Sequence, residues 1–333
     1  MKRIGRASVA FDDVSITSFA CVGGKMEGDG PLGGKIDKIF EDTLAGEETW
    51  EKAESRLVQE ASNLCIEKSG YTSSDFDYIF SGDLLNQCTA SSFGLITLGI
   101  PLIGMYGACS TMASTLLCAA VFTDSGAAER CIAATSSHFA SSERQFRNPL
   151  RYGGQRPPTA QRTVTGAGAM AVERGGRLRI TRATAGIITD LGIADANNMG
   201  AAMAPAAAST ILRHFDAAGT APEDYDRIVT GDLGTVGAQL LRELTHREGI
   251  DISPVHCDGG VMIFDLKAQD VHAGGSGCGC SATVMCSEIL PSLDRGETKR
   301  VLFVGTGALM SPTSSQQGNN IPAVAHAVEI ERI

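Results

Sequence analysis

Two stretches of the chain repeat the same order of apolar and polar positions. In the first, apolar residues recur at the spacing of an amphipathic helix: Trp50, Ala53, Leu57, Ala61 and Leu64. The second stretch has the same kind of spacing: Met203, Ala206, Leu212 and Phe215. A glycine follows each pattern, Gly70 or Gly219, and glycine readily adopts the left-handed conformation that closes a helix. The pattern therefore predicts two helices that end at these glycines.

The residues after the two glycines are alike position by position. GYTSSDFDYIFSGDL (residues 70–84) and GTAPEDYDRIVTGDL (residues 219–233) share a constant offset, because 219 − 70 and 232 − 83 are both 149. Each copy reads as a polar turn, a short apolar strand, and Gly-Asp-Leu at the carboxyl end of that strand. The similarity indicates an internal duplication.

A looser repeat follows further along each copy. GACSTMASTLLCAA (residues 107–120) and GSGCGCSATVMCSE (residues 275–288) are both glycine turns that lead into a helix of small residues, with Cys118 and Cys286 at matching places. Small side chains let a helix lie close to its neighbours. We therefore expect both helices to be central in the fold, with their N-termini directed at one shared site.

Further apolar runs predict strands at residues 130–138, 166–173, 177–184, 300–309 and 326–331. Together with the repeats they indicate an α/β protein of two similar βαβ-type units. We place the first unit at residues 1–175, with the Cys109 turn, and the second at residues 176–333. The boundary is expected near residues 175–186, where strands end one unit and begin the next.

Composition narrows the class of protein. The chain has 333 residues and a net charge of −10, without a basic tract, which argues against nucleic-acid binding. Its ten cysteines lie among apolar and small residues, as Cys65, Cys88, Cys118, Cys131 and Cys286 do. In a chain this long, buried free thiols in a reducing compartment are the better interpretation.

The chain carries no pattern typical of export or of a membrane span. Asp12 and Asp13 precede any apolar run long enough for a signal peptide. Residues 84–123 contain no charge, but glycines, Pro101 and polar side chains divide them into pieces shorter than the roughly 20 apolar residues that a span needs. We interpret this run as a helix, a strand and a second helix buried inside the fold.

The duplicated units, the cysteine at a strand-to-helix turn and the late Gly-x-Gly of VGTGAL together resemble the thiolase and ketoacyl-synthase fold. This resemblance predicts a layered α-β-α-β-α sandwich. Longer motifs are similar to the stage V sporulation protein AD family: GACSTM, SSHF, RQFRNP, YGGQRPPTAQRTVTGAGA, DGGVMIFD, QDVHAGGSGCGCSA and IPAVAHAVEIE. The resemblance implies a subunit of the SpoVA group that takes part in moving dipicolinic acid. It also implies a homodimer held at the spore inner membrane by integral SpoVA proteins.

Thiolase-type chemistry needs more than the cysteine at position 109. A histidine must assist the thiolate, and a second histidine or an asparagine must help to hold the oxyanion. The repeat places these two positions at Gly231 and near Ser276, and neither residue transfers protons. His256 is interpreted as a packed histidine at a strand, whereas His272, before a glycine turn, is either packed or part of the pocket. We therefore interpret Cys109 as the vestige of a nucleophile in a site that now binds a ligand.

The implied ligand is a flat pyridine ring with two carboxylates, free or chelated to Ca²⁺. Such a ligand needs N–H donors, a cationic partner or a bridging Ca²⁺, and a slot for the ring. The residues predicted to bind it are Asp83, Gln87, Cys109, Ser110, Thr111, Ser136, His138, Arg144, Arg147, His272 and Ser276. The amides of Ser110 and Thr111 are expected to be free at a helix start and to bind an anion.

Two of these assignments have alternatives. Asp83 would repel a bare carboxylate, so it fits a calcium-chelated ligand, and otherwise it caps its own loop. The arginine-rich segment at residues 144–162 either steers an anion inward or forms a surface or dimer contact.

Cys278 and Cys280 lie in a glycine turn without a second cysteine pair, so neither a metal nor a cofactor is predicted. The rival functions are acyl transfer by Cys109 and a purely structural role in assembly.

Overall fold

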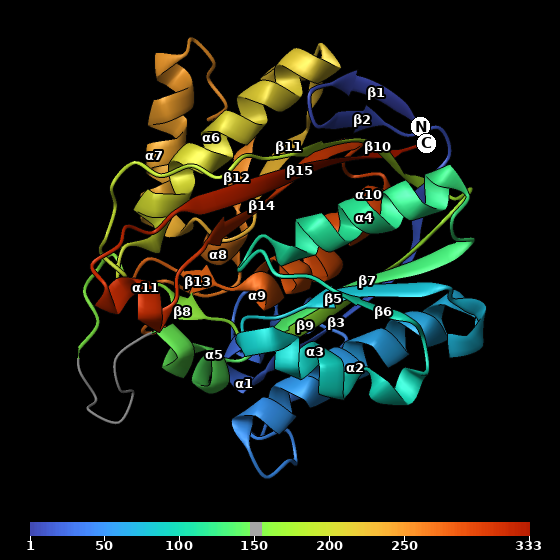
Figure 1. Cartoon of the computed structure of the whole chain (residues 1–333), viewed down its shortest axis with the longest axis horizontal. Helices are drawn as coiled ribbons and strands as arrows, with labels where there is room; N and C mark the ends of the chain where they lie inside the picture. Colours follow the sequence, from blue (N-terminus) through green and yellow to red (C-terminus); the bar gives the residue numbers. More distant parts are fainter. Residues whose placement is uncertain (147–154) are drawn as a thin grey trace.

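The computed structural model describes residues 1–146 and 155–333 (Figure 1). Its main sheet contains two groups of five strands that share one topology. The first group runs β6 (Leu102–Gly104), β5 (Tyr78–Gly82), β7 (Arg130–Ser137), β9 (Gly166–Glu173) and β3 (Ser15–Gly24). The second runs β12 (His256–Asp258), β11 (Arg227–Thr230), β14 (Arg300–Ala308), β15 (Ala323–Arg332) and β10 (Leu178–Ala185). Both groups have the order third, second, fourth, fifth, first. The assignment of residues 1–175 and 176–333 as two units stays a prediction.

The two groups join through antiparallel pairing of β3 with β10, in which Ile16 faces Leu178 and Ser15 faces Arg179. Short strands extend this sheet to 13 strands: β1 (Lys2–Gly5), β2 (Ser8–Ala10) and β4 (Lys38–Phe40). A separate parallel pair connects β8 (Arg162–Thr163) to β13 (Gly275–Ser276). Because β8 precedes β9 and β13 precedes α9, this pair is a second contact between the two repeated units.

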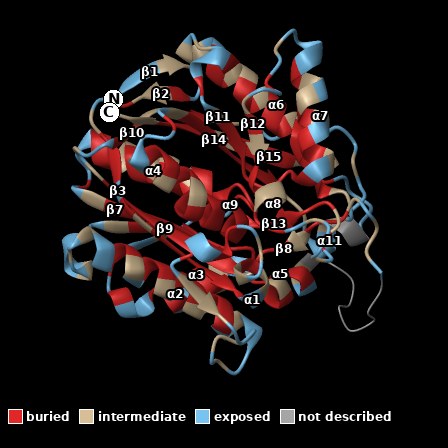
Figure 2. Ribbon diagram, turned by 180° about the vertical axis from the view of Figure 1, so that it is seen from behind, coloured by how far each residue is buried: buried red, intermediate tan, exposed pale blue. Residues whose placement is uncertain are grey.

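Helices fill three layers around the strands (Figure 1). The helices α2 (Trp50–Ser69) and α3 (Thr89–Gly94) cover the outer face of the first group, and α6 (Met199–Ala218) with α7 (Gly234–Arg247) covers the second. Between the groups lie α4 (Thr111–Ser125) and α9 (Cys278–Val284), and every residue of α9 is buried (Figure 2). The predicted α-β-α-β-α sandwich of thiolase type is confirmed.

The local signals at the two repeated helices hold. Thr49 caps α2 and Asn198 caps α6, each through a side-chain oxygen that accepts a backbone N–H. Gly70 and Gly219 end these helices in the left-handed conformation, with φ of 77° and 65°. Most residues of the predicted inner faces are buried, and the others are half-buried. The exception is Trp50, which is 38 % exposed at the first turn of α2.

Glycines allow backbones to touch in the middle layer. A Cβ atom on Gly279 of α9 would lie 2.4 Å from the carbonyl oxygen of Gly166 in β9. A Cβ on Gly305 of β14 would lie 2.6 Å from the Cβ of Ala113 in α4. The helix α9 runs on through a π-helical turn (Met285–Ile289) into α10 (Leu290–Arg295). The small residues of the second repeat thus place both helices in the interior, as predicted.

The uncharged run at residues 84–123 forms α3, β6 and most of α4. None of the helices described is both long and apolar enough to cross a membrane. All ten cysteines are unpaired, and Cys65, Cys131 and Cys286 are buried, while Cys88 and Cys118 are half-buried. The remaining helices are short: α1 (Lys25–Gly28), α5 (Phe139–Phe146), α8 (Gly259–Met262) and α11 (Pro312–Gln316).

Replacement of Gly279 by alanine tests the tight contact between α9 and β9. We expect Gly279→Ala to lower the free energy of unfolding by about 1–3 kcal/mol, because the new methyl group would meet backbone that cannot rotate away. Gly34→Ala is the matched control, because nothing lies within 4 Å of a Cβ at Gly34. Urea unfolding followed by circular dichroism measures both variants, and equal stability of the two would contradict the packing argument.

Candidate functional site

A tight turn between β6 and α4 holds Cys109. The Ser110 hydroxyl donates to the carbonyl of Gly107 at 2.7 Å, and the Thr111 hydroxyl accepts the Gly107 N–H at 3.1 Å. Ala108 takes the left-handed conformation with φ of 50°, which is strained for a residue with a Cβ. The turn also rests on β14, since a Cβ on Gly307 would lie 2.3 Å from the Gly107 carbonyl oxygen. These contacts fix the direction of the Cys109 side chain.

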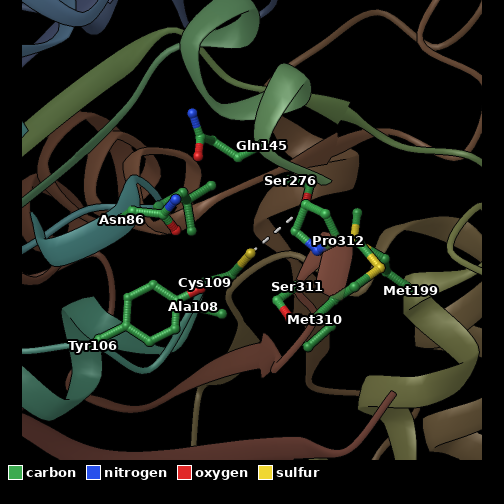
Figure 3. Close-up of a pocket in the computed structure, with 12 residues that line it drawn as sticks. Asn86, Tyr106, Ala108, Cys109, Gln145, Met199, Ser276, Met310, Ser311 and Pro312 are labelled. Atoms are coloured by element: carbon green, nitrogen blue, oxygen red, sulfur yellow. Dashed lines mark hydrogen bonds between the residues drawn. The ribbon is translucent and has the colours of Figure 1, made fainter. Parts of the chain in front are cut away.

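The Cys109 thiol points into a pocket between the two strand groups (Figure 3). The pocket has a volume of about 50 Å³. Its described lining comes from distant parts of the chain: Leu84, Asn86, Tyr106, Ala108, Cys109, Gln145, Met199, Ser276, Ala308, Met310, Ser311 and Pro312. The Cys109 sulfur lies 3.7 Å from the Ser276 hydroxyl oxygen, so the two glycine turns of the second repeat meet here.

A buried carboxyl group, that of Asp232, stands behind the Cys109–Ser276 contact. It accepts hydrogen bonds from the Ser276 hydroxyl at 3.0 Å, the Gly277 N–H at 2.7 Å and the Thr306 hydroxyl at 2.8 Å. Burial raises the pKa of Asp232, although its hydrogen bonds act in the opposite direction. Burial also raises the pKa of the Cys109 thiol well above its usual range, and the nearby Asp232 raises it further. The thiol is therefore protonated at neutral pH and is a poor nucleophile.

The importance of Asp232 was missed at the level of sequence, although the repeat contained the signal. The alignment of the two copies pairs Asp232 with Asp83, since both are the aspartate of Gly-Asp-Leu. The same alignment places the assisting histidine of a thiolase-type site at the adjacent Gly231, and Gly231 is therefore the position that the sequence singles out. In the structure the side chain that reaches Ser276 and Cys109 belongs to Asp232.

None of the six histidines lines this pocket in the described structure. His256 of β12 lies with its Nε2 2.9 Å from the Thr230 hydroxyl, and Arg242 donates to its Nδ1 at 3.0 Å. Burial lowers the pKa of His256 to about 3, and the Arg242 charge acts in the same direction, so the ring is neutral. His272 lies near the exposed Asp270, with Nε2 3.3 Å from its carboxylate. No histidine is therefore placed to take the Cys109 proton.

Two predicted ligand groups are occupied within their own loop. Asp83 accepts the Leu85 N–H at 2.9 Å and the Ser91 N–H at 2.8 Å, as in the loop-capping alternative. The expectation of free amides at Ser110 and Thr111 is wrong. Each N–H donates to a carbonyl three residues earlier, at 3.1 Å and 3.2 Å, because the chain makes a 3₁₀-like turn before α4 begins.

Other predicted residues lie away from the Cys109 pocket. Gln87 is exposed and outside the lining, whereas its neighbour Asn86 lines the pocket. The Ser136 hydroxyl faces Glu54 of α2 at 3.5 Å, on the other side of the first strand group. His138 lines a separate cavity of about 520 Å³, and its Nε2 is 2.8 Å from the Thr43 carbonyl oxygen.

The arginine-rich segment is only partly described. Arg144 of α5 forms an ion pair with Glu51 of α2, and its guanidinium lies 5.6 Å from the centre of the Trp50 ring. This contact matches the surface alternative for Arg144, since the residue lines neither cavity. Arg147 lies outside the described residues.

Comparisons with known proteins agree with the fold. A model of the family Stage V sporulation protein AD (SpoVAD) matches residues 5–331. The chain is 44% identical over 334 residues to Stage V sporulation protein AD of Bacillus subtilis, which covers 100% of this chain and 98% of that protein. Among solved structures, 3-oxoacyl-[acyl-carrier-protein] synthase III from Aquifex aeolicus superposes with a TM-score of 0.58 at 14% identity, covering 96% of this chain and 99% of that one. Cerulenin-bound OleA of Xanthomonas campestris gives a TM-score of 0.62 at 15% identity, covering 97% and 98%.

Alkylation of Cys109 tests the electrostatic role of Asp232. We expect Asp232→Asn to raise the rate of reaction with iodoacetamide at pH 8 by roughly threefold or more. Loss of the neighbouring negative charge lowers the thiol pKa, and each unit of pKa changes the thiolate fraction about tenfold. Peptide mass spectrometry follows Cys109 separately from the other thiols.

Asp258→Asn is the control for this measurement. The Asp258 carboxyl is also buried, but it accepts hydrogen bonds from Leu233, Gly234 and Thr230 rather than from groups beside Cys109. An equal rate in Asp232→Asn and the unchanged chain would show that Asp232 does not set the thiol pKa.

Proposed function

The chain belongs to the stage V sporulation protein AD family, and on this premise we propose that it binds dipicolinic acid in the Cys109 pocket without transforming it. The observation that carries the proposal is the set of groups around the thiol. A ketoacyl-synthase-type reaction needs a base beside the cysteine and donors for an oxyanion. Here the Cys109 thiol contacts the hydroxyl of Ser276 and the buried carboxyl of Asp232. The thiol stays protonated because its pKa is raised. Such a site favours binding over acyl transfer.

The described pocket lining suits a flat, polar-edged molecule bound with a cation, and the pocket, at about 50 Å³, would have to widen to admit the ring. Leu84 offers apolar contact for a ring. Tyr106 and Met310 do the same, while Asn86 and Gln145 offer amide groups (Figure 3). None of the described lining residues is lysine or arginine. Two carboxylates entering this pocket would therefore need a counter-charge, which favours the calcium chelate over free dipicolinate.

We further propose that the protein acts as a subunit of the SpoVA transport complex at the spore inner membrane. Family membership supports SpoVA proteins as the partners. With no membrane-spanning helix among the described residues, the membrane contact would come from integral partner proteins.

A homodimer through the edge strand β6 is the assembly that we propose. Leu102 in β6 is 38% exposed, and Phe93, Ile96 and Tyr106 beside this strand are 71%, 74% and 55% exposed. An edge strand with unpaired backbone groups and an apolar surround is a natural site for pairing with another strand. A second copy would cover both the strand edge and the apolar side chains.

Calorimetric titration with dipicolinate tests the proposed ligand. We expect saturable binding that is stronger with Ca²⁺ present, and weaker by roughly a hundredfold or more in Cys109→Trp, whose indole would occupy the pocket. Cys109→Ala is the matched control and should retain binding, because the pocket stays open and no thiol chemistry is required.

Mass spectrometry after incubation with acyl-CoA separates the rival function. A stable acyl adduct on Cys109, absent from Cys109→Ala, would support the acyl-transfer enzyme. Absence of dipicolinate binding with and without Ca²⁺ would refute the proposal and favour the purely structural role.

Sedimentation velocity tests the dimer. We expect Ile96→Glu together with Leu102→Glu to convert the dimer to a monomer, since two carboxylates per copy would be buried against each other. Ile188→Glu is the control, because Ile188 is 67% exposed on the loop between β10 and α6, away from β6. A monomer before any substitution, or a dimer that survives the double change, would exclude this interface.

A further inference from the structure

The larger cavity, of about 520 Å³, has no part in the proposed function. It opens where β3 passes into α1 and where α2 and α5 begin, and β8 closes one side. The residues that matter for its chemistry are Met26, Glu27, Trp50, Phe139, Ala140 and Arg162. None of its lining residues is shared with the Cys109 pocket, so the two cavities are separate.

Arg162 brings a positive charge to this cavity without a direct ion pair, since the carboxyl groups of Glu27, Glu143 and Asp270 act on it only over a longer distance. Its guanidinium carbon lies 3.8 Å from the centre of the Phe139 ring, and its buried Nε has no hydrogen-bond partner. Within the described part of the chain, its side chain forms neither an ion pair nor a hydrogen bond. Arg162 is half-buried, and a partly desolvated guanidinium without a hydrogen-bonded anion is costly, while its planar donors match a carboxylate. The position therefore calls for an anionic ligand.

Glu27 faces the same cavity, and one of its two carboxyl oxygens has no hydrogen-bond partner. It is 2% exposed, and its Oε1 accepts the Thr165 N–H at 2.9 Å, whereas the buried Oε2 has no partner. Burial raises the pKa of Glu27 to about 7, although its backbone hydrogen bonds and Arg162 act in the opposite direction. Near neutral pH much of the group is protonated, and a protonated carboxyl donates to a ligand oxygen.

The other charged groups near the cavity are paired. The Arg156 guanidinium, 4.9 Å from the centre of the Phe139 ring, forms an ion pair with Glu143 at 3.7 Å. Lys25 and Asp29 at the rim already form an ion pair at 3.2 Å. Burial lowers the pKa of His138, which keeps that ring neutral at physiological pH. Met26, Trp50, Phe139 and Ala140 supply apolar and aromatic walls.

We propose that this cavity is a second ligand site, which binds a small monocarboxylate with an apolar or aromatic body. The carboxylate lies against the Arg162 guanidinium and the free Oε2 of Glu27, and the body of the ligand packs on Trp50 and Phe139. A dicarboxylate fits less well, because its second charge would face Glu27 without a cation to meet it. The site thus differs from the dipicolinate pocket in both position and ligand charge.

Titration with 3-phenylpropionate at pH 6.5 tests this site, with calorimetry as the readout. We expect one saturable site, weakened at least tenfold in Arg162→Gln, where the cationic partner is lost, and largely restored in Arg162→Lys. Ala140→Leu should also weaken binding, because the added side chain enters the cavity. Cys109→Trp should bind 3-phenylpropionate as the unchanged chain does, and the neutral analogue 3-phenylpropanamide should bind at least tenfold more weakly.

Circular dichroism of each variant establishes that it is folded. If Arg162→Gln does not fold, the affinity of Ala140→Leu decides the test. Equal affinity in the unchanged chain and in the folded cavity variants would overturn the proposal. So would absence of binding, or binding that is lost in Cys109→Trp. Failure of dipicolinate to bind the Cys109 pocket leaves this result unaffected, because the two titrations use different ligands and different blocking variants.

Discussion

Direct contact between backbones in the middle layer is the constraint on which the site depends. Gly305 and Gly307 of β14 admit the Cys109 turn and the start of α4 at distances that a side chain would forbid. Gly279 allows the same close backbone contact between α9 and β9. Because both central helices begin so close to the strands, Cys109 and Ser276 come within contact of each other although they lie in different copies of the repeat.

The surroundings of the Cys109 thiol determine its reactivity. The solved structures that superpose on this chain, a 3-oxoacyl-[acyl-carrier-protein] synthase III among them, share its fold at 14–15% identity. In this chain the dominant effect at the thiol is desolvation, reinforced by a carboxyl group rather than relieved by an imidazole. The electrostatic surroundings of the thiol determine its reactivity. A cysteine at a helix start is not sufficient by itself.

The sequence predicted those features that depend on neighbours along the chain. Gly70 and Gly219 end their helices as expected, because a left-handed glycine is a local property. The first long strand, β3, carried no clear signal, since its partners β9 and β10 are about 150 residues away. Asp232 and the second cavity were missed for the same reason. Asp83 and Asp232 occupy equivalent positions in the repeat, yet one stabilises its loop while the other faces Cys109, and only tertiary contacts separate these uses.

Burial of the thiols has a consequence for the chemical lifetime of the protein. Oxidation of cysteine proceeds chiefly through the thiolate, and the ladder from sulfenic to sulfonic acid becomes irreversible after its first steps. Burial raises the pKa of Cys21 and Cys65 to about 12, and that of Cys278 and Cys280 well above the usual range. Cysteines kept protonated in a close-packed interior are therefore slow to oxidise, and the chemical lifetime of the protein depends on the folded core that excludes water from them.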